Sequence, residues 1–329
     1  MKKQLLIAAV AATMTSVAMA DISISGAAKV NYTNTDYDAA GTTDTNTASH
    51  EMDLKVKGKS GDTTVVINFG SIDSTASSTT DTTMDIEDAY VATSIAGVSV
   101  KAGQWDNGNN ALRESARNDG KVELGTEFSG VKVTYGTEAE ASSATQMVDY
   151  VKVAADIAGV SVSYKDVHTG EDISLSTTIG GVKASYLALN RDASNTDRSV
   201  VELSGSVGGV DVKVAQATAD SSARIEGDTW MGDFENSAYT GLTTAAYDLA
   251  NGQDVTAISL KTAMAGNTVE FRNIQVDDVT SKDVSFNKVI VTRPLAAGTT
   301  FEATYTMLDD DETNSNDADI LDLELAVKF

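Results

Sequence analysis

The sequence predicts an all-β protein, a transmembrane antiparallel β-barrel of 16–18 strands with a pore-constricting loop. Three observations lead to this fold class: an N-terminal export segment, a strictly alternating C-terminal strand, and a turn-plus-strand phrase that recurs between them. Strands of a membrane barrel alternate because one face meets lipid and the other faces the lumen. The mature sequence has no run of roughly 18 apolar residues, the minimum for a membrane-spanning helix.

The first twenty residues have the pattern of a signal peptide. Lys2 and Lys3 give a basic start, an apolar stretch follows, and Ala18-Met19-Ala20 is a small-x-small cleavage site. We therefore expect residues 1–20 to be removed during export and residues 21–329 to form one barrel domain.

The final nine residues alternate between an apolar face and a mainly charged face. This pattern is typical of a strand between lipid and water, and a terminal aromatic residue is typical of outer-membrane barrels. The apolar face consists of Leu321, Leu323, Leu325, Val327 and Phe329. The opposite face consists of Asp322, Glu324, Ala326 and Lys328.

Composition excludes several other classes. The chain has no cysteine, which excludes thiolate metal sites, and one proline, which suits long hydrogen-bonded ladders. The net charge of -24 becomes -26 once Lys2 and Lys3 are removed, and such a charge argues against nucleic acid as a partner. Composition alone is also compatible with a soluble, secreted all-β protein.

An internal repeat favours the membrane barrel. A glycine followed by an alternating Val-x-Val or Val-x-Ala strand recurs, with polar stretches of variable length between copies. The spacing varies, unlike that of a β-solenoid. The repeats begin at Gly97, Gly130, Gly159, Gly181 and Gly209.

Counting tight turns gives the number of strands. Three more turns, at 59–62, 265–267 and 296–298, bring the total to eight, which predicts 18 strands. One misassigned hairpin would give 16. The weakest segments are 268–278 and 284–295, where the alternation slips.

The alternation assigns each strand one lipid face and one lumen face. A lumen full of charged side chains cannot be a packed core, so it must hold water. The expected lipid face comprises Ile22, Ile24, Val30, Val65, Ile67, Phe69, Val98, Val100, Val131, Val133, Val160, Val162, Phe301, Ala303 and Tyr305. The expected lumen face comprises Lys29, Lys55, Lys57, Lys101, Lys132, Lys165, Lys183, Lys213, Lys261, Glu302, Asp322 and Glu324.

Four stretches resemble the general trimeric porins of Gram-negative outer membranes. They are the signal sequence, the start at residues 21–26, the segment from Lys121 to Tyr135, and the end at residues 326–329. The resemblance implies an integral outer-membrane protein that passes ions and small hydrophilic solutes passively. Members of that family typically have 16 strands, so a count of 18 is a departure.

The resemblance also implies that the loop from Trp105 to Asp119 folds into the barrel and narrows it. In such porins the loop presents acids to basic residues on the wall, and Arg113 and Arg117 leave the sign of this constriction open. The candidate acids are Asp106, Glu114 and Asp119. The candidate wall bases are Lys29, Lys55 and Lys57. An ordinary extracellular loop is the alternative.

Other functions have weaker support. A substrate-selective channel would need aromatic and arginine residues along the lumen, and an adhesin or receptor barrel would depend on the acidic loops alone. Those loops could also bind outer-membrane lipids through divalent metals, although the 309–319 run lacks the spacing of a calcium loop. His50 and His168 form no recognisable catalytic arrangement, so we expect neither an enzyme nor a cofactor. Small residues at Gly26 and Ala28 suggest a flat contact in a homotrimer.

Overall fold

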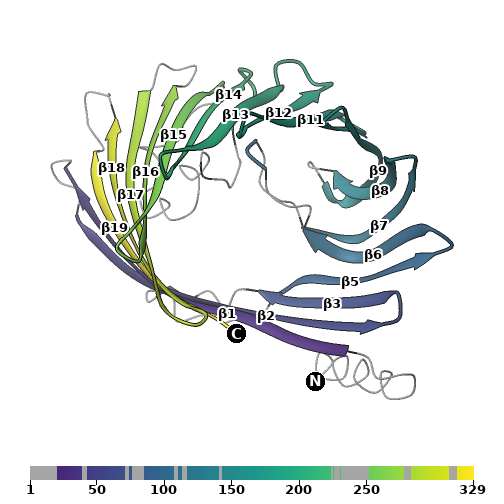
Figure 1. Cartoon of the computed structure of the whole chain (residues 1–329), viewed down its shortest axis with the longest axis horizontal. Helices are drawn as coiled ribbons and strands as arrows, with labels where there is room; N and C mark the ends of the chain where they lie inside the picture. The colour runs from purple at the N-terminus through teal and green to yellow at the C-terminus, as the bar shows by residue number, and fades with distance from the viewer. Residues whose placement is uncertain are drawn as a thin grey trace.

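The computed structural model describes most of the chain as one continuous sheet (Figure 1). No helix among these residues is long and apolar enough to cross a membrane. The predicted signal peptide lies outside the described residues. Those residues are 21–38, 43–70, 74–75, 85–106, 110–112, 117–140, 143–223, 225, 230, 252–277, 283–310 and 317–329.

Nineteen strands are present in this described part. Eighteen are long, and one, β4, has only two residues. Their bounds are β1 (Asp21–Tyr37), β2 (Thr45–Ser60), β3 (Thr63–Gly70), β4 (Ser74–Thr75), β5 (Asp85–Ile95), β6 (Val98–Asp106), β7 (Arg117–Phe128), β8 (Val131–Glu140), β9 (Ser143–Ile157), β10 (Val160–Val167), β11 (Gly170–Ile179), β12 (Val182–Arg191), β13 (Arg198–Val207), β14 (Val210–Ala219), β15 (Asp254–Met264), β16 (Asn267–Asp277), β17 (Asp283–Ala296), β18 (Thr299–Asp310) and β19 (Ala318–Lys328).

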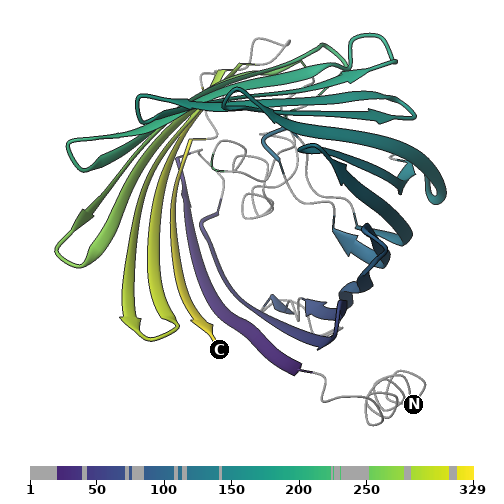
Figure 2. The same ribbon diagram turned by 45° about the vertical axis from the view of Figure 1, so that its right-hand side comes forward.

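The long strands close into a barrel. Each is antiparallel to the next in sequence, β3 pairs directly with β5, and β1 pairs with both β2 and β19. Figure 2 shows β1 in purple beside β19 in yellow at this seam. The short β4 pairs only with β2 and adds nothing to the ring. The count of 18 barrel strands is therefore confirmed.

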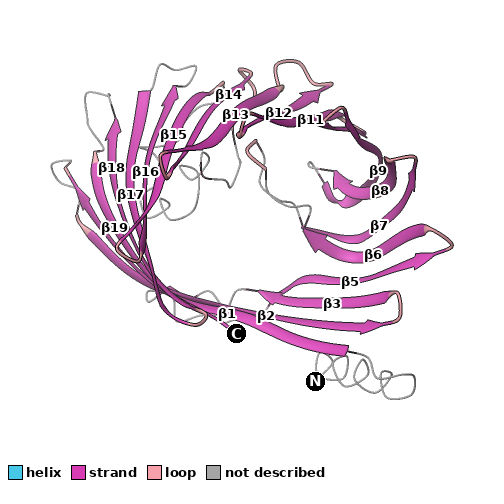
Figure 3. Cartoon of the chain, viewed as in Figure 1, coloured by secondary structure: helices cyan, strands magenta, loops and turns pink. Residues whose placement is uncertain are grey.

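All eight predicted tight turns join strands at one end of the barrel, and the longer connections lie at the other end (Figure 3). Two consecutive residues with positive φ match the twist of the flanking strands, and glycine adopts this conformation without strain. Six turns have this geometry: Ala96–Gly97, Ser129–Gly130, Ala158–Gly159, Gly180–Gly181, Gly208–Gly209 and Ala265–Gly266.

The strand register confirms the predicted outer face. Val30, Val131 and Tyr305 alternate with inward residues and are exposed on the outside of the barrel. Phe128, which is 82% exposed, ends β7 at the tight-turn end. An outward band of exposed apolar side chains is the surface that a barrel presents to lipid.

The inner face corrects one expectation, because part of it is apolar and packed. Inward side chains of β12–β19 form a buried hydrophobic cluster that includes Ile274, Val284 and Phe286. Both faces of β16 and β17 are therefore partly apolar, which is why the alternation slips in segments 268–278 and 284–295. The two segments are nevertheless regular strands.

The C-terminal residue completes the seam. The Phe329 amide donates to the Gly26 carbonyl at 3.0 Å, and the Gly26 amide donates to the Phe329 carbonyl at 2.9 Å. A Cβ atom at position 26 would lie 2.6 Å from the Phe329 ring. Position 26 is a glycine because the Phe329 ring leaves no room for a side chain there. This role differs from the trimer contact that the sequence suggested.

Candidate pore and its constriction

Charged side chains line the inner face of β1 and β2. Lys29 forms an ion pair with Glu51 at 2.5 Å, and the two residues are direct cross-strand partners. Lys55 and Lys57 follow at two-residue intervals on β2 and therefore share this inner face. The three predicted wall bases all lie on the lumen side.

A cluster of lysines and aromatic rings lies where β6 ends and the 107–116 connection begins. The Lys101 ammonium lies 4.2 Å from the ring centroids of both Tyr90 and Trp105. Lys121 is completely buried, 4.5 Å from the Trp105 ring centroid, and donates to the Trp105 carbonyl at 3.2 Å. These contacts fix the first residue of the predicted constriction loop.

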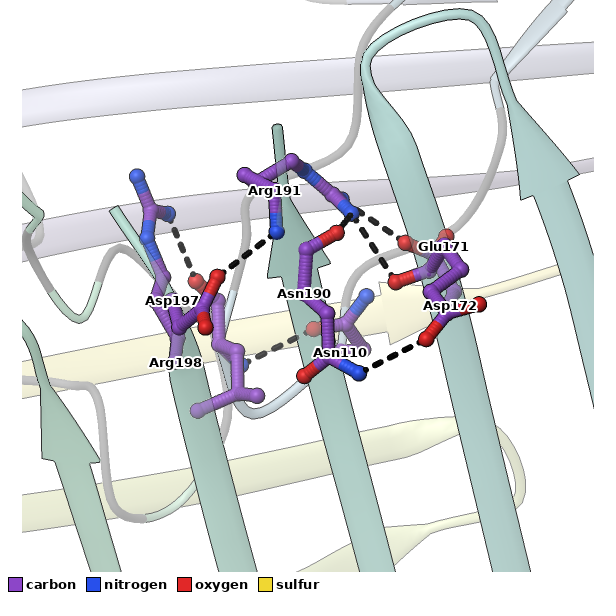
Figure 4. Close-up of polar contacts among 8 residues, drawn as sticks. Asn110, Glu171, Asp172, Asn190, Arg191, Asp197 and Arg198 are labelled. Atoms are coloured by element: carbon purple, nitrogen blue, oxygen red, sulfur yellow. Dashed lines mark hydrogen bonds and ion pairs between the residues drawn. The ribbon is translucent and has the colours of Figure 1, made fainter. Parts of the chain in front are cut away.

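The described tip of this loop lies against the strands on the far side of the barrel. Leu112 is 0% exposed and belongs to the inner hydrophobic cluster. Its carbonyl accepts a hydrogen bond from the Arg198 guanidinium on β13 at 3.0 Å. Its amide donates to the Asn110 side chain at 2.8 Å, and Figure 4 shows Asn110 together with Arg198 and the polar residues of β11–β13. The segment 110–112 therefore lies inside the barrel.

A polar network at the loop end of β11–β13 surrounds this contact (Figure 4). The Arg191 guanidinium pairs with the Asp172 carboxylate at 2.7 Å and donates to the Glu171 carbonyl at 3.1 Å. The Arg191 amide donates to the Asp197 carboxylate at 2.7 Å. A cavity of about 750 Å³ opens beside it, lined partly by Tyr150 and Arg191.

The connection between β14 and β15 also reaches the inner wall. Ile225 is 0% exposed in the same hydrophobic cluster, and its amide donates to the Gln253 side-chain carbonyl at 2.7 Å. Trp230 donates to Glu202 at 2.7 Å and packs against the cluster. Ile225, Trp230 and Gln253 therefore pack within the barrel.

A second cavity of about 530 Å³ has Trp230 in its lining. Its lining includes Lys213, Lys261 and Arg272, with Glu270 between the last two. The Glu270 carboxylate lies 2.6 Å from the Arg272 guanidinium and 3.5 Å from the Lys261 ammonium. Its charge is compensated, so the cavity is polar without a large excess of one sign.

The acidic candidates of the constriction are only partly described. Asp106 lies at the end of β6, where its amide donates to the Asp88 carboxylate at 3.2 Å. Arg113 and Glu114 lie outside the described residues, and only the backbone of Arg117 and Asp119 is described, within β7. The predicted opposition of acids and bases across the constriction therefore remains a prediction.

The sequence did not identify several of the residues that position the loop. Lys101 was assigned to the lumen, but its two aromatic partners were not identified, and Lys121 was not singled out. Leu112 lies 86 residues from Arg198, and no local pattern links residues so far apart. In the described part of the chain no cluster of His, Cys, Asp or Glu could hold a metal ion.

No protein-family model and no curated protein matches the sequence. Solved structures do match. A BenF-like porin from Pseudomonas fluorescens Pf-5 is 13% identical, with a TM-score of 0.63, over 94% of this chain and 98% of that chain. Pseudomonas aeruginosa OpdQ is 12% identical with a TM-score of 0.64, and Acinetobacter baumannii OccAB4 is 11% identical with a TM-score of 0.63, both over 94% of this chain and 98% of theirs. The chain therefore shares their fold.

Proposed function

We propose that this protein is a porin of the Gram-negative outer membrane, a water-filled channel for passive diffusion of ions and small hydrophilic solutes. One observation carries the proposal: a closed 18-stranded barrel, apolar outside, has charged inner strands and a loop segment across its interior. The similarity to a BenF-like porin supports the same class. The chemistry needs no cofactor, and the protein acts as a channel rather than an enzyme.

Single-channel recording tests this function. Purified protein added to a planar lipid bilayer should give discrete, reproducible current steps. A correctly folded barrel, verified by its heat-modifiable electrophoretic mobility, that inserts without producing current would refute the channel and favour the adhesin or receptor barrel.

A substrate-selective channel is the second candidate. The observation that favours it is the 530 Å³ cavity, where Trp230 lies beside Lys213, Lys261 and Arg272, since an aromatic ring among cations can bind one class of solute. A selective channel should show current block that saturates with one solute class. A general porin should pass solutes according to size.

Selectivity at the constriction is a finer part of the proposal. Basic wall residues favour anions, whereas the acidic loops favour cations, and we expect a mild preference for cations. Replacing Glu114 by Gln and Asp119 by Asn should shift the zero-current potential in a salt gradient toward anions. An unchanged potential at low salt would mean that these two side chains do not face the pore.

Export and assembly complete the proposal. Cleavage after Ala20 should give a mature N-terminus at Asp21, which N-terminal sequencing would detect. The proposal of a homotrimer rests on the resemblance to trimeric porins. Gly26 does not support a trimer contact, because the Phe329 ring covers this residue. Native mass spectrometry from mild detergent tests it, and a monomer would refute it.

A further inference from the structure

The inner wall of the barrel has a region that solvent does not reach. Val255, Ala257, Ile274 and Val276 are 0% exposed, although all four point inward. Ile258 and Phe271, on the same two strands, point outward and are exposed. In an empty barrel, both the outward and the inward side chains would be accessible to solvent. Other residues inside the barrel must therefore cover the four inward side chains.

Two segments from distant loops provide part of that cover. Leu112, from the connection after β6, and Ile225, from the connection after β14, are both 0% exposed within the same cluster. Polar contacts hold each segment in place: Arg198 donates to the Leu112 carbonyl, and Gln253 accepts from the Ile225 amide. The cluster is therefore a small hydrophobic core built inside the barrel.

The inner wall of β10 and β11 has exposed polar residues instead. Ser161 and Ser174 point inward and are exposed, and Lys165, which lies nearer the loops than both, is half-buried. Only the inward Tyr150 and Val167, nearer the loops still, are buried among the described apolar residues of β9–β11. These polar side chains have access to solvent inside the barrel.

We infer that the aqueous path is confined to one side of the lumen, along the inner wall of β9–β11, and that the inner wall of β14–β19 near the loops is a dry core. The part of this inference that concerns the path of solutes rests on the proposed channel function. The division of the inner wall into a wet side and a dry side does not depend on it. Closely packed apolar side chains exclude water, and an ion that entered them would lose its hydration without compensation. Solutes consequently follow the polar wall.

Cysteine accessibility tests the inference, because the natural chain contains no cysteine. Ser174→Cys places a thiol on the polar wall, and Ala257→Cys places one on the dry wall. Each folded variant is treated with a small, charged methanethiosulfonate reagent. Ser174→Cys should react at least about tenfold faster, because the thiol in Ala257→Cys becomes accessible only when the core opens locally.

A second pair, Lys165→Cys and Ala215→Cys, guards against a single variant that fails to fold, and each position is the sixth residue of its strand after a tight turn. Both members replace inward residues, and Ala215 is 2% exposed. Heat-modifiable mobility verifies each barrel, and unfolded samples should react equally in all variants. Equal rates on the two walls of folded barrels, or no reaction at the polar wall, would overturn the inference.

Current recordings separate this inference from the proposed function. Modification of Ser174→Cys should lower the single-channel current, whereas treatment of Ala257→Cys should leave it unchanged. Folded, unsubstituted protein that gives no current would refute the channel, while the labelling rates would still decide which wall is wet.

Discussion

The inner walls of β9–β11 and of β14–β17 belong to the same barrel but differ in chemistry. On the first, the exposed inward positions hold serines, and on the second the inward positions nearer the loops hold the buried Ala257, Ile274 and Phe286. The outward residues of both walls are mainly apolar where they meet lipid. The difference shows that an inner wall takes its character from what covers it: water selects polar side chains, and an inserted loop selects apolar ones.

Burial of the loop residues explains why the second wall can hold a loop in place. Fully burying a leucine or isoleucine side chain contributes roughly 1.5–3 kcal/mol, and Leu112 and Ile225 are both fully buried. This gain offsets part of the conformational entropy lost when the loop segments are ordered. A polar wall offers no comparable gain.

The largest effect is expected from a charge placed in the dry wall. Ile274→Asp puts an unpaired carboxylate among apolar side chains, and we expect a loss of more than about 4 kcal/mol in the stability of the internal core. The melting temperature of the barrel should fall and its current should become noisy. Ser174→Asp, an inward substitution on the polar wall, is the control and should leave the melting temperature nearly unchanged.

Truncation of the loop residue should have the next largest effect. Leu112→Ala removes a fully buried side chain, a change that typically costs about 2–5 kcal/mol. Weaker docking of the 110–112 segment should increase open-channel noise and the mean conductance. Leu203→Ala makes the same chemical change on the exposed outer face of β13 and should not alter the current. A quiet, unchanged channel in Leu112→Ala would contradict the docking.

The fold was predictable because its signals are local. Each tight turn needs residues that tolerate positive φ, and pairs such as Gly208–Gly209 indicate a turn from two adjacent residues alone. Period-two alternation then assigns the two faces of each strand. Eighteen strands followed from counting these turns.

The internal core was not predictable because it depends on contacts between distant residues. Leu112 looked like an ordinary loop residue, and nothing near it in sequence indicates that Arg198 lies beside it. The irregular alternation around Arg272 to Ile274 was the one available signal, since it marked inward apolar positions. It was interpreted as weakness of the strand rather than as a covered inner wall.

A smaller effect should separate the two walls electrically. Glu123 lies on the inner face of β7 and accepts a hydrogen bond from Tyr150, whereas Glu270 lies beside the dry wall, where Arg272 and Lys261 compensate its charge. If solutes follow the polar wall, Glu123→Gln should shift the zero-current potential toward anions more than Glu270→Gln does. The experiment requires low salt, because a Debye length of about 8 Å at physiological ionic strength screens distant charges. A larger shift in Glu270→Gln would place the path on the opposite wall.

The smallest effect is expected at the base of the constriction loop. Lys101→Met keeps a long side chain between Tyr90 and Trp105 but removes the ammonium, so it should cost about 0.5–2 kcal/mol of cation–π attraction. Lys121 still contacts the Trp105 ring and carbonyl, and for this reason the loop should stay docked. The fluorescence of Trp105, recorded with Trp230 replaced by Phe, should shift without a comparable change in open-channel noise. Lys183→Met, on the inner face of β12, controls for the loss of one lumen charge. Noise equal to that of Leu112→Ala would mean that the lysine and ring cluster, rather than the hydrophobic contact at Leu112, holds the loop inside the barrel.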